Sequence, residues 1–419
     1  MIITVASVDT GIVSYVTALF HDLFNTNFNP TNPNTILVCT VCLLLLQTIF
    51  NIFGVTFLGS ISRIGTYVET LGTIGIAILL AAVGYHHGIG FLFTTQGAQF
   101  AHSNPLGVDF HGNWLLGAAL VAVLAHVYIF YGFEAAGDVA EEVVDSSRRV
   151  PRAIISSLLI GGLTSFILVA GLLLAIPAGA KNYATATSFA GGVPFIISSN
   201  IHSKAMQDII LLLVCFAFFS CGLAVQGAGA RLAFSYARDG ALPGSKVVRK
   251  VSTRFRTPVN AVLLGAIVPV LFAFLVHFNP SKPVHFLFIT YPPGVNALFI
   301  LVSFGVSGIY LSFFLVVLAA LIAWLRGWRP EGSFKLGVWA YPVIIVALIY
   351  QVLMLLNILI PTGISSPKGA LFNYDWLTLA VVVLIVAFGA VYYLVARPQN
   401  RIAAQGHAAR KEAPTTPVL

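Results

Sequence analysis

The segment Phe130–Ile154 reads FYGFEAAGDVAEEVVDSSRRVPRAI, and it decides how the rest of the chain is interpreted. It begins inside a long apolar run and then holds five of the chain's 14 acidic residues: Glu134, Asp138, Glu141, Glu142 and Asp145. Three arginines and a proline follow them. This placement requires an explanation, because a carboxylate at the centre of a membrane costs about 2.5–3.5 kcal/mol on insertion scales.

The composition indicates a membrane protein. The 419 residues are 58% hydrophobic and only 9% charged, whereas a soluble domain is about 25% charged. Apolar runs of about 20 residues, the length that crosses a bilayer, recur along the chain. We therefore predict an all-α polytopic membrane domain over residues 1–396 and a short cytoplasmic tail over 397–419. The ten predicted spans are 2–20, 35–57, 65–84, 113–143, 153–177, 207–236, 259–277, 295–325, 337–360 and 375–396.

The basic residues alternate between the loops. If the loops are assigned in turn to the two sides of the membrane, one set of loops plus the tail holds 17 of the 22 lysines and arginines, and the other set holds four. Cytoplasmic loops carry the excess of basic residues. We therefore expect both termini in the cytoplasm, in what we take to be the plasma membrane. The net charge of +8 is explained by this topology, so no nucleic-acid partner is invoked.

The predicted span 113–143 is too long for one straight crossing, because its 31 residues at 1.5 Å each exceed the thickness of the bilayer core. Gly132 lies near its middle and permits irregular backbone. Broken helices at this depth are typical of secondary transporters, where freed backbone groups bind substrate or ions. We predict a break between about Tyr128 and Phe133.

Two acids lie deep enough to have a function. Glu134 shares a helical face with Asp138, four residues on; it could brace the break, or it could take a proton or contact a cation. Glu69 could pair with Arg63 or reach water, or it could take part in coupling. Asp9 carries less information because it lies so near the chain start.

The remaining polar residues predict no catalytic or metal site. The acids from Glu141 onward are expected at the cytoplasmic edge, paired with Arg148, Arg149 and Arg152. The Cys39–Cys42 spacing could mark a metal or redox pair, but no second pair completes it, so buried inert thiols are the simpler interpretation. No phosphate-binding loop is present, which argues against ATP-driven pumping. We expect no cofactor and no metal.

Several segments together resemble amino acid permeases of the amino acid–polyamine–organocation superfamily. The opening segment resembles the sixth helix and following loop of that family. Further resemblances occur in order along nearly the whole chain: NIFGVTFLGSISRIGTYVE from Asn51, GARLAFSYARDGALPGS from Gly229, PVNAVLL from Pro258, NALFILVSFGVSGIYLSF from Asn296 and SFKLGVWAYPV from Ser333.

The resemblance implies a transporter core of five-plus-five inverted repeats and assigns roles to the break. Tyr128 falls at the aromatic residue that gates the substrate. The backbone carbonyls of Ile129, Phe130 and Tyr131 fall where the substrate amine is bound. Gly132 marks the break, and Phe133 lines the pocket. The chemistry is reasonable, because carbonyls at a helix end carry partial negative charge and aromatic faces attract ammonium groups.

The resemblance also implies that the chain starts at the family's third helix, without the glycine-rich broken first helix that binds the substrate carboxylate. We expect residues 1–419 alone to lack half of the substrate site. Three function classes remain open. They are a gradient-coupled permease for an amino acid or small amine, a non-transporting accessory, sensor or inactive protein on the same scaffold, and an intramembrane enzyme, which has least support. The amine, the coupling proton or ion and the oligomeric state stay undefined.

The topology can be tested by labelling. In a variant without the native cysteines, a cysteine placed at Lys181 or Lys282 should react with an impermeant thiol reagent added outside cells. A cysteine at Lys246 should react only after the cells are permeabilised. The reverse pattern would contradict the assigned orientation.

Overall fold

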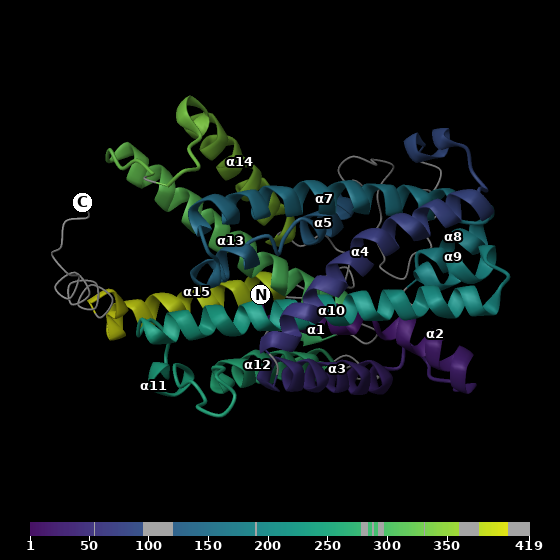
Figure 1. Ribbon diagram of the computed structural model, residues 1–419, viewed down its shortest axis with the longest axis horizontal. Helices are drawn as coiled ribbons and strands as arrows, with labels where there is room; N and C mark the ends of the chain where they lie inside the picture. Colours follow the sequence, from purple (N-terminus) through teal and green to yellow (C-terminus); the bar gives the residue numbers. More distant parts are fainter. Residues whose placement is uncertain are drawn as a thin grey trace.

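The computed structural model describes residues 1–53, 55–94, 120–188, 191–277, 284–286, 289–291, 297–330, 332–359 and 377–400. These residues form an elongated bundle of long helices (Figure 1). Eight of the described helical segments are long and apolar enough to cross a membrane, and α12 adds a shorter apolar helix. This confirms the predicted all-α polytopic fold. The long helices are α1 (Ile2–Gly11) continued by α2 (Val13–Phe24), α3 (Pro33–Phe53), α4 (Val55–Val83), α7 (Ser146–Leu174), α10 (Lys204–Arg238), α12 (Val259–His277), α13 (Ala297–Leu325), α14 (Ala340–Leu359) and α15 (Leu377–Ala396).

Short elements connect the long helices. Between α7 and α10, where a loop was predicted, the chain forms two short helices. Val284–Phe286 and Ile289–Tyr291 form a small antiparallel pair of strands, β1 and β2, that the sequence analysis did not predict. The other short elements are η1 (Ile89–Phe93), α5 (Leu120–Ile129), α6 (Ala135–Asp138), η4 (Ala140–Glu142), α8 (Ala180–Ala186), α9 (Gly192–Asn200), α11 (Ser245–Val248) and η5 (Gly337–Trp339).

The first span, α1 with α2, occupies the centre of the bundle. Two thirds of its most apolar stretch is buried inside the protein (67%), compared with 28% or less for every other described span. Helices α3, α10, α12 and α13 all pack against α1, which lies among them in Figure 1. The outer spans turn most of their apolar surface outward, as expected for helices that face lipid.

The structure begins α7 at Ser146, seven residues before the predicted start at residue 153. Proline inside a helix cannot donate to the carbonyl four residues back. In the structure the helix continues through Pro151. The hydroxyl of Ser333 donates a hydrogen bond to the Ser147 carbonyl, 2.9 Å away, so the carbonyl that Pro151 leaves free is satisfied by a distant segment.

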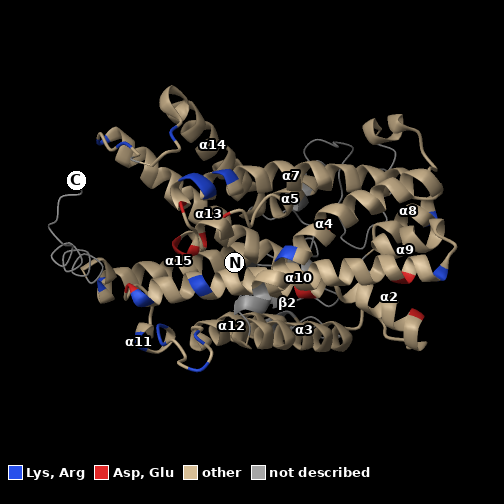
Figure 2. Ribbon diagram, in the orientation of Figure 1, with Lys and Arg blue, Asp and Glu red and all other residues tan. Residues whose placement is uncertain are grey.

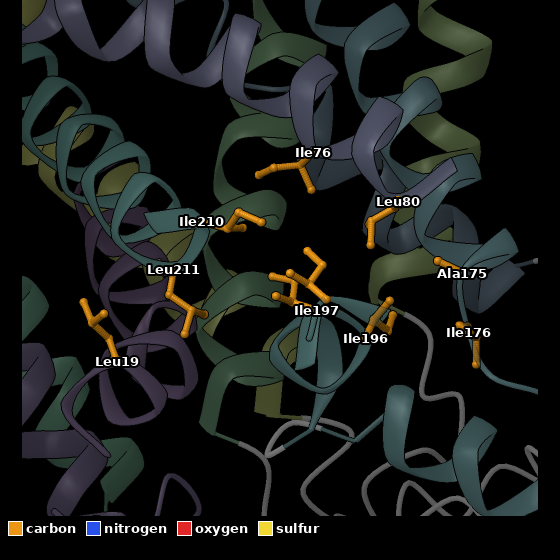
Figure 3. Packing of buried hydrophobic residues seen from close by; sticks show 10 residues of the cluster. Leu19, Ile76, Leu80, Ala175, Ile176, Ile196, Ile197, Ile210 and Leu211 are labelled. Atoms are coloured by element: carbon orange, nitrogen blue, oxygen red, sulfur yellow. The ribbon is translucent and has the colours of Figure 1, made fainter. Parts of the chain in front are cut away.

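A buried apolar cluster joins one end of the bundle. Figure 3 shows side chains from α2, α4, α9 and α10 and from the end of α7 converging there. Asn200, at the end of α9, stabilises the same region, because its amide donates to the carbonyls of Ala175 and Ile196 at 2.8 Å each. The cluster comprises Leu19, Ile76, Leu80, Ala175, Ile176, Ile196, Ile197, Ile210 and Leu211 with Ile201.

The charged side chains are distributed unequally between the two ends of the bundle (Figure 2). Figure 2 shows many of the lysines and arginines at the end of the molecule that holds α11 and the start of α7. At that end Glu141 pairs with Arg238 and Glu142 with Arg231. At the opposite end Lys204 pairs with Asp22 at 2.6 Å. None of the described ion pairs joins a loop predicted on the cytoplasmic side to a loop predicted on the other side.

The predicted helix break is confirmed. Helix α5 ends at Ile129 and α6 begins at Ala135, with non-helical backbone between them. Gly132 has φ +98°, a conformation that residues with a Cβ rarely adopt. The first part of the predicted span, 113–119, lies outside the described residues.

Two glycines near the break provide a matched test. A methyl group added at Gly132 or at Gly137 would meet nothing within 4 Å, but only Gly132 has positive φ. Gly132→Ala should therefore destabilise the fold by about 1–2 kcal/mol through backbone strain alone. Gly137→Ala should be neutral or stabilise by up to about 1 kcal/mol. Unfolding of the purified variants in detergent measures both. Equal effects of the two substitutions would contradict strain at Gly132.

Candidate substrate and coupling site

The break leaves backbone carbonyls free at the end of α5. The last helical hydrogen bond there runs from the Phe130 N–H to the His126 carbonyl. None of the described backbone N–H groups donates to the carbonyls of Tyr128, Ile129 or Phe130. Carbonyls at a helix C-terminus carry partial negative charge. This part of the chain can therefore attract a cation or a hydrogen-bond donor.

The Glu134 side chain accepts a hydrogen bond from the backbone just after the end of α5. One of its carboxylate oxygens, Oε2, accepts a hydrogen bond from the Gly132 N–H at 2.8 Å. That N–H would otherwise donate to the Tyr128 carbonyl in a continuous helix. The other oxygen, Oε1, is buried and has no partner among the described residues. The arrangement provides the brace at the break that the sequence analysis considered.

Tyr128 joins the break to the central helix. Its hydroxyl lies 2.9 Å from the Ser7 hydroxyl on α1. Its ring meets the ring of Tyr131 edge to face, with centroids 5.0 Å apart, a favourable geometry for aromatic pairs. The structure therefore brings two of the sequence-predicted residues together beside α1.

The other aromatic residues of the predicted site point to different helices. Phe133 stacks on Phe313 of α13, with ring centroids 5.0 Å apart. Phe130 packs over Gly162 of α7, where a Cβ would lie 2.7 Å from the phenyl ring. Ile129 is exposed. The side chains of the break thus anchor it to three surrounding helices, and only Tyr128 and Tyr131 share one location.

Two acidic residues that follow the break, Glu141 and Glu142, form ion pairs with arginines of α10. They do not pair with the arginines that are close to them in the sequence. Arg238 makes a bidentate ion pair with Glu141 at 2.8 and 2.9 Å. This hydrogen bonding, together with the positive charge of Arg238, lowers the pKa of Glu141. Arg231 pairs with Glu142 at 2.8 Å. The expected pairing of both acids with Arg148, Arg149 and Arg152 is wrong, because Asp145 turns the chain with φ +55° before those arginines enter α7.

Glu69 lies on α4, separate from the break. It is half-buried and makes no ion pair with Arg63 among the described contacts. It lies four residues after Gly65, which packs directly on Ser220 of α10. Residues four apart share a helical face, so Glu69 lies on the side of α4 that faces α10.

The sequence analysis missed a buried polar pair on the central helix. Asp9 of α1 is 1% exposed and Gln47 of α3 is 0% exposed. The Gln47 amide donates to Asp9 Oδ1 at 2.7 Å. The available signal was an isolated polar residue inside each apolar span, at TVASVDTG and LLLLQTIF. Polar residues in such positions are usually conserved for a partner or a function.

A second cluster of buried polar side chains lies next to this pair, between α3 and α10. The Gln226 amide donates to the Thr48 hydroxyl at 2.9 Å, and the Asn51 amide donates to Gln226 Oε1 at 2.8 Å. Asn51 also reaches the Leu223 carbonyl of α10 at 3.2 Å. These bonds satisfy the buried amides and connect α3 to α10, as interhelical hydrogen bonds commonly do in membranes.

No metal centre is found within the described residues, where no three His, Cys, Asp or Glu side chains gather as metal ligands would. The four cysteines are free thiols. The chemistry available near the break is therefore that of carbonyl oxygens, tyrosine rings and buried carboxyl groups.

Comparison with known proteins identifies the family. The sequence model of the family described as amino acid permease matches residues 1–396. An amino-acid permease of Arabidopsis thaliana, BAT1, is 25% identical over 82% of this chain and 63% of its own length. A putative polyamine transporter of Candida albicans is 25% identical over 62% of this chain and 44% of its own length. A choline transporter of Saccharomyces cerevisiae is 28% identical over 55% of this chain and 39% of its own length.

The aligned part thus spans about two fifths to three fifths of the length of these relatives. The family match, in contrast, covers nearly all of the chain and includes the central helix, the break and α10. The fold and the sequence agree: this chain belongs to the amino acid permease family.

Proposed function

We propose that the protein is a secondary transporter that moves an amino acid or a related small amine across a membrane, coupled to an ion gradient. The observation that carries the proposal is the break between α5 and α6, which presents unpaired carbonyls beside the Tyr128 ring. Family membership supports it. The relatives' names, which include an amino-acid permease, a polyamine transporter and a choline transporter, share a positively charged amine or ammonium group as the substrate feature.

The proposed binding site uses both features of the break. The carbonyls of Ile129, Phe130 and Tyr131 bind the ammonium group, because each oxygen carries partial negative charge and lacks a helical donor. The Tyr128 ring adds a cation–π contact. Gly132 permits the backbone turn, and Phe133 lines the site where it packs on α13.

Glu134 and Glu69 are the sequence-derived candidates for coupling. The hydrogen bond from the Gly132 N–H to Glu134 supports a structural role for this acid at the break. Its second oxygen remains available for a proton or a cation. Glu69 faces α10 from α4, and its partial exposure allows proton exchange with water.

The proposed location is the plasma membrane, with both termini in the cytoplasm. The gathering of many lysines and arginines at one end of the molecule supports this orientation, because basic loops are retained on the cytoplasmic side.

Tyr128 provides the functional test. In proteoliposomes, we expect Tyr128→Phe to retain most uptake, because the ring remains and only the Ser7 hydrogen bond is lost. Tyr128→Ala should raise the apparent substrate constant about tenfold or more, since a desolvated cation–π contact contributes about 1–2 kcal/mol. The measurement is uptake of radiolabelled leucine, γ-aminobutyrate, putrescine and choline, by residues 1–419 and by the chain extended upstream in its reading frame.

Tyr67→Ala on α4 is the matched control, because Tyr67 is 63% exposed and lies outside the site. It should leave uptake unchanged. A Tyr128→Phe variant as impaired as Tyr128→Ala would assign the effect to the hydroxyl. Absence of uptake of all four compounds by both forms of the chain would refute the proposed function.

A further inference from the structure

Asp9 is a buried carboxyl group with one oxygen left without a partner. Gln47 Nε2 donates to Asp9 Oδ1 at 2.7 Å. Asp9 Oδ2 and Gln47 Oε1 are both fully buried, and neither has a hydrogen-bond partner among the described residues. Two acceptor oxygens without a donor are costly inside a protein, since an unsatisfied buried polar group costs about 1–3 kcal/mol. The pair therefore lacks a hydrogen-bond donor, and a proton bound to Asp9 would provide one.

In the part of the chain that the structure describes, no lysine or arginine forms an ion pair with Asp9. The helices packed against α1 are α2, α3, α10, α12 and α13, and among these only α10 carries lysine or arginine. Its three basic residues pair elsewhere: Lys204 with Asp22, Arg231 with Glu142 and Arg238 with Glu141. The other titratable groups on these helices and at the α5 contact are Tyr15, His21, Asp22, Cys39, Cys42, Asp208, Cys215, Cys221, Tyr236, His277, Tyr310 and Tyr128.

An ionised Asp9 would therefore be an isolated buried charge, which proteins avoid by neutralising the group. Glutamine suits a carboxyl group that changes its protonation state, because its amide contains both a donor and an acceptor. The Gln47 N–H₂ pairs with an ionised Asp9. After rotation of the amide, Gln47 Oε1 can accept a hydrogen bond from a protonated Asp9.

The close packing around the pair favours a proton over a metal cation. Gly222 of α10 covers both side chains: a Cβ at this position would lie 2.4 Å from Gln47 Nε2 and 3.0 Å from Asp9 Oδ1. A hydrated or multiply coordinated cation needs several oxygen ligands, whereas Gln47 presents an N–H to the carboxylate. The small residue on α10 lets the helices close over the pair, so that Asp9 is 1% and Gln47 0% exposed.

Asp9 lies behind the proposed substrate site. Ser7, two residues earlier on α1, contacts Tyr128 at the break. Residues two apart on a helix point in directions about 200° apart, so α1 presents Ser7 to α5 and Asp9 to α3 and α10. One rigid helix thus contacts the break on one side and holds the acid on the other.

We propose that Asp9 is the residue that binds the coupling proton. Oδ2 takes one proton from water on the side of higher proton activity, and Asp9 becomes neutral as α1 packs against α3 and α10. The proton leaves to water on the opposite side when that interface separates, and the carboxylate charge returns. This inference rests on the proposed transport function for its role, but the protonation of Asp9 can be tested without transport.

The first test is infrared spectroscopy of purified residues 1–419 in liposomes at neutral pH. Exposed aspartates are ionised there, so the carbonyl stretch of protonated carboxylic acids reports only buried acids. The difference between wild type and Asp9→Asn should contain one such band, and Asp145→Asn, at an exposed aspartate, should give none. No band from Asp9 would overturn the inference. If Asp9→Asn does not fold, Asp9→Glu should shift the frequency of the band, which would still assign it to residue 9.

The second test separates binding of the proton from its coupling role. In proteoliposomes, Asp9→Asn should keep the exchange of labelled leucine, γ-aminobutyrate, putrescine or choline across the membrane but lose all stimulation by an inward proton gradient. Asp9→Glu should restore part of that stimulation. A purely structural Asp9 would leave the stimulation intact in Asp9→Asn, and this result would overturn the inference. Absence of exchange both by wild-type residues 1–419 and by the chain extended upstream would refute the proposed function, while the infrared result would still decide the protonation of Asp9.

Discussion

Non-helical backbone inside a bilayer is tolerated only where it is buried in protein or lines a water-filled cavity, because lipid offers no hydrogen bonds. The break between Ile129 and Ala135 imposes this requirement on the helices around it. The response is visible in the contacts. Glu134 satisfies the Gly132 N–H, Phe133 anchors the break to α13, and Tyr128 bonds to Ser7. Through the Tyr128–Ser7 contact the break is joined to α1, the most buried of the described spans.

The polar residues of the central helices divide into two kinds. Gln226, Thr48 and Asn51 satisfy one another and connect α3 to α10, so their hydrogen bonds specify packing. Asp9 and Gln47 satisfy only half of their hydrogen-bonding capacity. A half-satisfied pair at the centre of a membrane protein lowers the stability of the fold. Buried ionisable groups that carry such a cost in membrane proteins commonly have a function. The small residues of α10, Gly222 among them, let the helices approach closely enough to bury both kinds.

Prediction succeeded where the signal was local. The apolar spans follow from segment length, and the break follows from a long span with Gly132 near its middle, because a positive φ at glycine is a property of a few adjacent residues. Prediction was wrong where a distant segment intervened. Pro151 stays inside α7 because the Ser333 hydroxyl takes the role of the missing donor, and Glu141 pairs with Arg238, which is 97 residues away in the sequence.

Composition and local sequence were enough to predict the membrane class, the approximate positions of the described spans, the broken helix and the resemblance to permeases, since each depends on composition or on residues close together in the chain. Only the tertiary structure decided that α1 is the central helix and that Asp9 meets Gln47. The physical reason is that an apolar helix can face lipid or protein with the same composition. Which face is buried, and which two isolated polar residues meet across 38 positions of sequence, depends on how all the helices pack.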